Sequence, residues 1–236
     1  MSTPHFPAPE WMSVSSSLAA ALAHEVRNPL LSIKGAAQLL AQAVGPEDRT
    51  LAELIVTEAN RIDQLIATLD PLTPTPTQST EALNVHEIME HARLSVRSFA
   101  PHIHTATRYD PSLPTTRGNR EALMQAMLNL VRNAAEALAE HPAPNLTFAT
   151  RYLAGERMLR PDGQPLTLAL SLTDNGPGVE PSLVPRLFTP FNSGKPGGKG
   201  LGLAITAKII EEHGGLIAYE SPAGGGARFS VYLPVG

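Results

Sequence analysis

The chain has 236 residues, of which 42% are hydrophobic and 5% aromatic, with a formal net charge of −4 and no cysteine. This length allows one large domain or two modest ones with an aliphatic core, and the charge argues against a dominant nucleic-acid surface. The lack of cysteine excludes disulfides and thiolate chemistry and fits a reducing compartment. No apolar run approaches the ~20 residues of a membrane span and no signal peptide is recognisable, so the sequence predicts a soluble cytoplasmic protein.

The first third of the chain predicts a helical hairpin behind a short leader. Residues 1–12 contain three prolines and no periodic pattern, which indicates a disordered leader. Over residues 13–70, apolar side chains recur at three- and four-residue steps with a break at Gly45-Pro46, which predicts two antiparallel helices. A lone hairpin cannot cover both apolar seams, so two hairpins from two subunits are expected to form a four-helix bundle. Residues 71–80 are rich in proline and threonine and predict a linker.

Residues 81–236 predict an α/β domain in which helices pack on one face of a mixed sheet. A capping-box-like start at Asn84 and a possible cap at Asn119 mark two of the helix beginnings. Val184–Phe188 is expected to form a short helical turn, and Gly214-Gly215 to end the last helix. The helices are expected over residues 84–99, 119–140 and 201–213, and the strands over 103–109, 146–153, 166–173, 216–220 and 228–233.

The stretch from His24 to Pro29 combines an imidazole, a carboxylate and a carboxamide within the first predicted helix. In a helix, Asn28 lies one turn after His24 on the same face, and Glu25 is close enough to touch the ring. This is a possible nucleophile with a base beside it. Considered alone, the pattern is more typical of an ordinary surface or core histidine than of a nucleophile.

Two asparagines four residues apart, Asn129 and Asn133, share one face of the predicted 119–140 helix. Asparagine is a poor residue for a helix interior because its side chain competes for backbone hydrogen bonds, so two on one face need a reason. A carboxamide oxygen is a hard neutral ligand that suits Mg²⁺, which takes its other ligands from phosphates and water. The alternative is a solvated polar face.

The sequence Thr-Asp-Asn-Gly-Pro-Gly-Val, residues 173–179, follows an apolar strand. Gly176 and Gly178 permit a close approach of the backbone, and a buried Asp174 could accept a hydrogen bond from an exocyclic amino group such as adenine N6. The same residues also make an ordinary turn.

A glycine-rich, lysine-bearing loop over residues 188–202 leads into the last predicted helix. Backbone N–H groups at a helix N-terminus favour phosphate, and such a loop can close over a ligand as a lid. The loop is neither a Walker A sequence nor a dinucleotide-binding turn, because no Gly-Lys-Ser/Thr opens the helix and no first strand precedes it. A mobile surface loop is the alternative.

The order and spacing of these motifs resemble those of two-component sensor histidine kinases. His24–Pro29 resembles the H box, Asn129–Asn133 the N box, Asp174–Gly178 the G1 box, Phe188–Phe191 the F box and Gly198–Gly202 the G2 box. The resemblance covers the chain from about residue 14 onward.

Finer features resemble the nitrogen-regulation (NtrB-type) branch of these kinases: residues 34–40, Tyr109–Pro114 and Phe229–Pro234. The resemblance implies a dimeric helical hairpin, residues 13–70, joined to a GHKL (Bergerat-type) ATP-binding sandwich, residues 81–236. It also implies ATP and Mg²⁺ as cofactors, and a response regulator of NtrC type and a PII-type signal protein as partners.

By resemblance, His24 is phosphorylated, Glu25 assists as base, and Asn28 positions the water that hydrolyses the phosphorylated regulator. Asp174 would read adenine and Asn133 would hold the metal. The remaining residues implied to bind nucleotide are Asn129, Gly176, Gly178, Lys195, Gly198, Lys199, Gly200, Leu201 and Gly202.

Two features depart from the NtrB-type pattern. About a dozen residues precede the first helix, where relatives usually carry a sensory domain, and Lys199 lies between Gly198 and Gly200, where a small or polar residue is common. Two alternatives also stay open. One is a GHKL-type ATPase that uses ATP to gate a conformational change without phosphohistidine, and the other is a non-catalytic dimeric scaffold.

Overall fold

The computed structural model describes residues 4–7, 26, 28–67, 80–153, 155, 158–192, 194 and 200–236. The chain divides into two compact units, one of Pro9–Pro76 and one of Met1–Ala8 with Thr77–Gly236. This division falls within the segment expected to be a linker, of which residues 71–79 lie outside the described residues. Across the described ranges, no helix is both long and apolar enough to cross a membrane.

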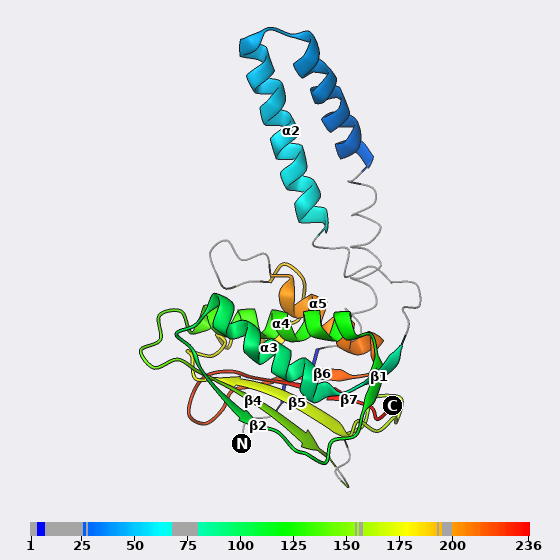
Figure 1. Cartoon of the computed structure of the whole chain (residues 1–236), viewed down its shortest axis with the longest axis vertical. Helices are drawn as coiled ribbons and strands as arrows, with labels where there is room; N and C mark the ends of the chain where they lie inside the picture. Colours follow the sequence, from blue (N-terminus) through cyan, green and yellow to red (C-terminus); the bar gives the residue numbers. More distant parts are fainter. Residues whose placement is uncertain are drawn as a thin grey trace. The chain divides into compact units, whose positions relative to one another are not determined.

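The smaller unit is a helical hairpin, formed by a helix over residues 28–43 and α2 (Pro46–Ala67), which run antiparallel (Figure 1). Its own seam is narrow, since the buried apolar side chains among its described residues are Leu30, Ala37, Ala52 and Ala59. Many larger apolar side chains are exposed in the single chain: Val26, Leu31, Ile33, Leu39, Leu40, Leu51, Leu54, Ile55 and Ile62. One hairpin therefore leaves much of its apolar surface in contact with water, as the sequence predicted.

The larger unit is a two-layer α/β sandwich. Three helices, α3 (Val85–Phe99), α4 (Arg120–Ala137) and α5 (Gly202–Glu212), cover one face of a five-stranded sheet (Figure 1). The strand order is β2-β4-β5-β7-β6; β2 and β4 are parallel and the other neighbours antiparallel, so the predicted mixed sheet is confirmed. The strands are β2 (His104–Arg108), β4 (Asn145–Tyr152), β5 (Leu168–Asp174), β6 (Leu216–Glu220) and β7 (Arg228–Leu233).

Local sequence signals account for the helix ends. The side-chain oxygen of Asn84 accepts a hydrogen bond from the His86 N–H at 3.0 Å, and that of Asn119 accepts one from the Ala122 N–H at 2.8 Å. Both asparagines are N-caps that satisfy N–H groups without partners in the first helical turn. The predicted apolar face of α4 is buried: Leu123, Met127, Leu130, Val131, Ala134 and Leu138.

Two features of this unit differ from the sequence prediction. A short antiparallel pair, β1 (Glu81–Leu83) and β3 (Thr116–Gly118), was not expected, because three-residue strands carry almost no periodic signal. Residues 4–7 belong to the leader expected to be disordered, yet His5 pairs with Tyr219 of β6. An edge strand presents unpaired backbone N–H and C=O groups, which explains why a segment without a pattern of its own can be ordered there.

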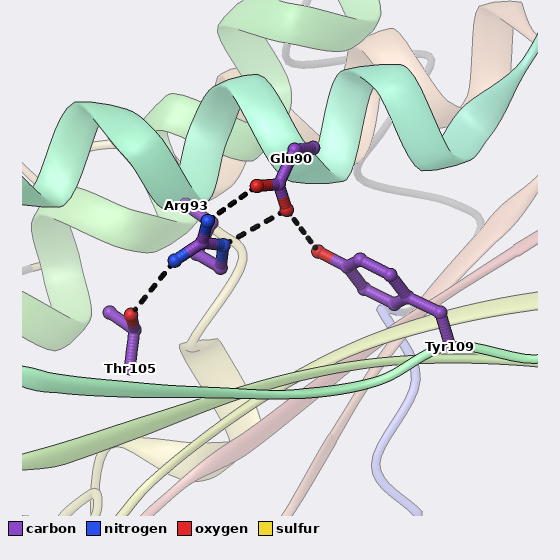
Figure 2. Close-up of polar contacts among 4 residues, drawn as sticks. All are labelled: Glu90, Arg93, Thr105 and Tyr109. Atoms are coloured by element: carbon purple, nitrogen blue, oxygen red, sulfur yellow. Dashed lines mark hydrogen bonds and ion pairs between the residues drawn. The ribbon is translucent and has the colours of Figure 1, made fainter.

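A polar cluster joins α3 to β2 (Figure 2). The Arg93 guanidinium contacts both carboxylate oxygens of Glu90 and donates to the Thr105 hydroxyl at 3.3 Å, and the Tyr109 hydroxyl lies 3.5 Å from Glu90. Hydrogen bonds from Arg93 lower the pKa of Glu90, and burial raises the pKa of Tyr109 to about 12. The cluster therefore stays as an ion pair with a neutral phenol at physiological pH.

Asp110, directly after β2, fastens the end of that strand to β4. Its Oδ2 accepts from the Tyr152 N–H at 2.9 Å, and its Oδ1 accepts from the N–H of Ser112 at 3.0 Å and from the Ser112 hydroxyl at 2.6 Å. The Asp110 N–H donates to the hydroxyl of buried Thr150 at 3.0 Å. Residues 109–114, which resemble the NtrB-type branch, thus have a structural role at this end of the sheet.

These hydrogen bonds, led by that of the Ser112 hydroxyl, lower the pKa of Asp110 to about 2. A depressed carboxyl pKa stabilises the fold above the ordinary value of about 4, and this contribution is lost as the pH falls through about 2. We therefore expect Asp110→Asn to melt at a lower temperature than wild type at pH 7, with the difference shrinking from pH 4 to pH 2. Carboxyl NMR titration checks the pKa directly. Ser112→Ala should raise it, and a wild-type midpoint near 4 would contradict the assignment.

Candidate functional site

One face of α4 forms the spine of the site, because Asn129, Asn133 and Ala137 are spaced by four residues. The Asn129 amide donates to the Gly202 carbonyl at 3.4 Å, and a Cβ placed on Gly202 would lie 3.9 Å from the Asn133 amide nitrogen. One turn further along α4, the Ala137 carbonyl lies 3.4 Å from the position of a Cβ on Gly176. The same helix face thus meets the start of α5 and the loop after β5.

Asp174 ends β5 with its side chain buried, at 5% exposure. Its Oδ1 accepts from the Gly176 N–H at 2.9 Å and the Ala227 N–H at 3.2 Å. Burial raises the pKa of Asp174, and the two backbone donors oppose that rise. Neither of these bonds uses Oδ2, so the arrangement orients a carboxylate oxygen as an acceptor for a donor on a ligand.

Gly226 allows the loop before β7 to pass against Asp174. Its φ is +85°, and a Cβ there would lie 2.0 Å from the Asp174 carbonyl oxygen. Gly178 has φ +77°, and its Cβ would approach the Gly226 carbonyl to 2.8 Å. The two glycines therefore permit three backbone segments to meet around the Asp174 carboxylate.

We expect Gly226→Ala to lower the free energy of unfolding by at least about 2 kcal/mol and to displace Asp174, because the new methyl group overlaps backbone and demands a left-handed conformation. Urea denaturation and nucleotide titration measure the two effects. Gly224→Ala is the matched control, since a Cβ there meets nothing within 4 Å. Equal denaturation midpoints for the two variants would contradict the prediction.

Residues outside the predicted set hold the Asp174 loop in place. Asn175 accepts from the Asn145 N–H at 2.7 Å and donates to the Ala143 carbonyl at 2.8 Å. The Tyr219 hydroxyl accepts from the Val179 N–H at 3.3 Å. Sequence reasoning did not find Tyr219, Gly226 or the backbone of Ala227, although the three glycines before β7 were a possible signal.

The first turn of α5 faces the asparagines of α4. The Gly202 carbonyl accepts from the Thr206 hydroxyl at 2.8 Å as well as from Asn129, and Leu201 is buried. No side chain caps this helix start, so its N–H groups are suited to an anion. Gly200 lies directly before this turn, whereas Lys195, Gly198 and Lys199 lie outside the described residues.

The structure does not describe the predicted phosphoacceptor pair, because His24 and Glu25 also lie outside the described residues. Asn28 is helical and exposed, and its carbonyl accepts from the Ser32 hydroxyl at 3.4 Å. The hairpin site is therefore described at one of its three predicted residues, Asn28.

No group of three or more histidine, aspartate or glutamate side chains in the described part of the chain is placed to hold a metal ion. A separate hollow of about 490 Å³ beside α3 and α4 shares Asn129 with the site. The other residues that line the hollow are His91, Arg120, Glu121, Met124, Gln125, Leu128 and Arg132.

Comparison with known families places both units. Residues 118–236 match the family "Histidine kinase-, DNA gyrase B-, and HSP90-like ATPase", and residues 15–72 match the "His Kinase A (phospho-acceptor) domain". The chain is 41% identical over 223 residues to the "Sensory histidine kinase/phosphatase NtrB" of Rhizobium leguminosarum bv. phaseoli. The aligned region covers 93% of this chain and 58% of that protein. The chain belongs to the histidine kinase-, DNA gyrase B- and HSP90-like ATPase family and carries a His Kinase A domain before the ATPase domain.

Further relatives and solved structures agree with the family. The NtrB protein of Azospirillum brasilense is 42% identical over 210 residues, 87% of this chain and 52% of that protein. The chain therefore spans a little more than half the length of the NtrB proteins it matches. The mycobacterial sensor histidine kinase MprB is 26% identical with a TM-score of 0.54, over 66% of this chain and 97% of that one. Full-length ShkA in complex with AMPPNP, 24% identical, shares the fold with a TM-score of 0.60, over 92% of this chain and 45% of that one.

Proposed function

We propose that this chain is an ATP-dependent protein histidine kinase that phosphorylates itself on His24 and passes the phosphoryl group to an aspartate of a response regulator. We further propose that it removes the phosphoryl group from that regulator. The observation that carries the proposal is the convergence of Asn129, Asn133 and the Asp174 loop on one face of α4, in a chain that also matches a phospho-acceptor domain.

In the proposed complex, Asp174 accepts a hydrogen bond from the exocyclic amino group of adenine through Oδ2. The bonds from Gly176 and Ala227 to Oδ1 fix the carboxylate, so its free acceptor is oriented before the ligand arrives. The uncapped start of α5, with Gly200, Leu201 and Gly202, lies where N–H groups and the helix dipole favour phosphate. Lys195, Gly198 and Lys199 remain predicted parts of the lid.

A magnesium ion suits the carboxamide oxygen of Asn133, which is half-buried and directed toward Gly202, with phosphate oxygens as further ligands. When bound, the ion supplies positive charge that stabilises the phosphate oxygens. Asn129 would support this shell while it holds the Gly202 carbonyl.

The chemistry at the hairpin follows from its side chains. One ring nitrogen of neutral His24 attacks the γ-phosphorus in line, so an N–P bond forms, the bond from the γ-phosphorus to the bridging oxygen breaks, and ADP leaves. Glu25 accepts the proton or a hydrogen bond from the other ring nitrogen. Asn28 exchanges no proton, which suits a carboxamide that positions the water in the separate phosphatase reaction, in which water attacks the aspartyl phosphate of the regulator and releases inorganic phosphate and a free aspartate.

The proposed assembly is a homodimer. A second hairpin would cover the large apolar side chains that one hairpin leaves exposed, among them Leu39, Leu51 and Leu54. The proposed partners are a response regulator of NtrC type and a PII-type signal protein, supported by the identity to NtrB proteins. A cytoplasmic location is part of the proposal and fits a chain without cysteine.

Incubation with γ-labelled ATP tests the proposal. We expect an acid-labile, base-stable label that peptide mapping places on His24. A chain that hydrolyses ATP without labelling itself would favour the gating ATPase. A chain that binds no nucleotide would favour the scaffold.

A further inference from the structure

The outer edge of β6 is occupied by the chain's own N-terminal segment. The His5 N–H donates to the Tyr219 carbonyl at 2.8 Å, and the Tyr219 N–H donates to the His5 carbonyl at 2.9 Å. Two residues that exchange both of their backbone hydrogen bonds form a hydrogen-bonded pair of an antiparallel ladder. Residues 4–7, which are all half-buried, are called the strap below.

The side chains of the strap alternate between the two faces of the sheet, as those of a genuine strand do. His5 stacks on Phe188 with ring centroids 6.5 Å apart and planes within 7°, on the face that carries the helices. Phe6 lies 6.4 Å from Tyr232, whose register places it on the opposite face. His5 extends a cross-strand row formed by Tyr219, Phe229, Leu172 and Phe148.

Prolines limit the strap to one pair of hydrogen bonds. By the alternation of a strand, the residue-4 nitrogen faces outward and the residue-7 nitrogen faces β6, but Pro4 and Pro7 carry no N–H. Pro7 therefore ends the ladder, and Pro4 blunts the new edge against further pairing. A strap with two backbone bonds and two ring contacts is weak enough to detach without unfolding the sheet.

The residue that binds the strap also holds the candidate nucleotide loop. The backbone of Tyr219 pairs with His5, while its hydroxyl accepts from the Val179 N–H at 3.3 Å. Phe188, which stacks on His5, also packs edge-on against Phe229 at 6.5 Å. Strap and loop therefore share Tyr219, and ordering one restricts the other.

We propose that the outer edge of β6 is a docking surface for an extended peptide, that the strap of the same chain occupies it, and that docking strengthens nucleotide binding at the Asp174 loop. The docking itself is independent of the proposed function, whereas its effect on nucleotide rests on it.

Amide hydrogen exchange in the full chain tests the docking. In wild type, the Tyr219 amide should be protected, and His5→Pro, which removes the donor to the Tyr219 carbonyl, should speed its exchange by about tenfold or more. Pro4→Ala is the matched control and should leave the rate unchanged, because the nitrogen at residue 4 faces outward. Pro7→Ala should slow exchange, since it restores an N–H that faces β6. A wild-type amide that exchanges at the unprotected rate, or equal rates in wild type and His5→Pro, would overturn the docking.

Titration with Mg·ADP tests the coupling. We expect His5→Pro to weaken ADP binding by about threefold to tenfold, equivalent to about one lost hydrogen bond, with Pro4→Ala unchanged. Equal affinities in wild type and His5→Pro would overturn the coupling and leave the docking standing. Absence of ADP binding in wild type would instead contradict the proposed function. Protection of Tyr219 that grows with protein concentration would show that a second copy supplies the strap and would overturn the intramolecular assignment.

Discussion

Replacing Asp174 by asparagine is expected to lower the affinity for ATP by about 100-fold or more, because the new side chain places a donor where the proposed adenine contact needs an acceptor. Two backbone N–H groups, from Gly176 and Ala227, already point at Oδ1. The single oxygen of asparagine must serve them, so its NH₂ group takes the place of Oδ2. That NH₂ then faces the exocyclic amino group of adenine, and neither can accept.

The same substitution is expected to leave the protein without nucleotide at least as stable as wild type at pH 7. Burial raises the pKa of Asp174, so ionising it in the folded state costs stability. The sign follows from linkage: wild-type stability is fully present below the ordinary carboxyl pKa of about 4 and falls as the pH rises through the higher folded value. Asparagine has no such loss, so the advantage of the variant should grow between pH 4 and pH 7.

Calorimetric titration with ATP and thermal melting at pH 4 and pH 7 separate these two effects. Asp162→Asn is the matched control, because Asp162 lies in an exposed turn where it accepts from the Gln164 N–H at 3.1 Å. It should bind ATP like wild type. An Asp174→Asn protein that binds ATP within about threefold of wild type would show that the carboxylate does not read adenine.

The opposed outcomes for binding and stability distinguish a functional residue from a structural one. Replacing a buried aspartate that supports the fold lowers the stability of the protein, whereas replacing one that serves a ligand leaves the stability unchanged or raises it. The expected pattern at Gly226 is the reverse: Gly226→Ala should lose stability first, because its methyl group would overlap the Asp174 carbonyl. Comparing the two variants therefore separates the acceptor from the backbone that supports it.

Local signals were sufficient to predict most helices and strands. The caps Asn84 and Asn119 lie at the ends where the sequence placed them, and β6 and β7 have the predicted bounds. Periodicity and capping depend on residues within a few positions of each other, so one sequence contains them. The apolar face of α4 was predictable for the same reason.

Features that depend on distant partners were not predictable. The strap is ordered by an edge more than 200 residues away in the chain, and β1 is defined by its register with β3. Asp110 reads as a turn residue, yet it also accepts from Tyr152 on β4. Nothing near these residues in sequence indicates the partner, because tertiary packing alone brings the segments together.

The candidate site lies between these extremes. Its residue types could be predicted, but for Asn129 and Asn133 the sequence left a solvated polar face as an alternative. The structure directs both toward Gly202, and Asn129 donates to its carbonyl. Gly226 and Ala227 contact Asp174 through their backbone, and they belong to a turn that carries no charge or nucleophile. Such supporting residues escape a search for reactive side chains.

The second large effect concerns the hairpin, where we expect two substitutions four residues apart to separate two activities. His24→Gln should abolish self-labelling from γ-labelled ATP, a loss of about 1000-fold or more, because glutamine has no nucleophilic ring nitrogen. Asn28→Ala should keep self-labelling and lose at least about tenfold in dephosphorylation of the regulator, because the proposed role of the Asn28 carboxamide is to position the attacking water.

Each activity is measured with the purified 236-residue chain, first with labelled ATP alone and then with a phosphorylated response regulator of NtrC type. Ser32→Ala is the control on the same helix face, since it removes a hydroxyl that donates to the Asn28 carbonyl and touches neither proposed role. An Asn28→Ala protein with full phosphatase activity would defeat the assignment of Asn28. Labelling that persists in His24→Gln would show that another residue accepts the phosphoryl group, because the glutamine amide is not a nucleophile that could replace the His24 ring.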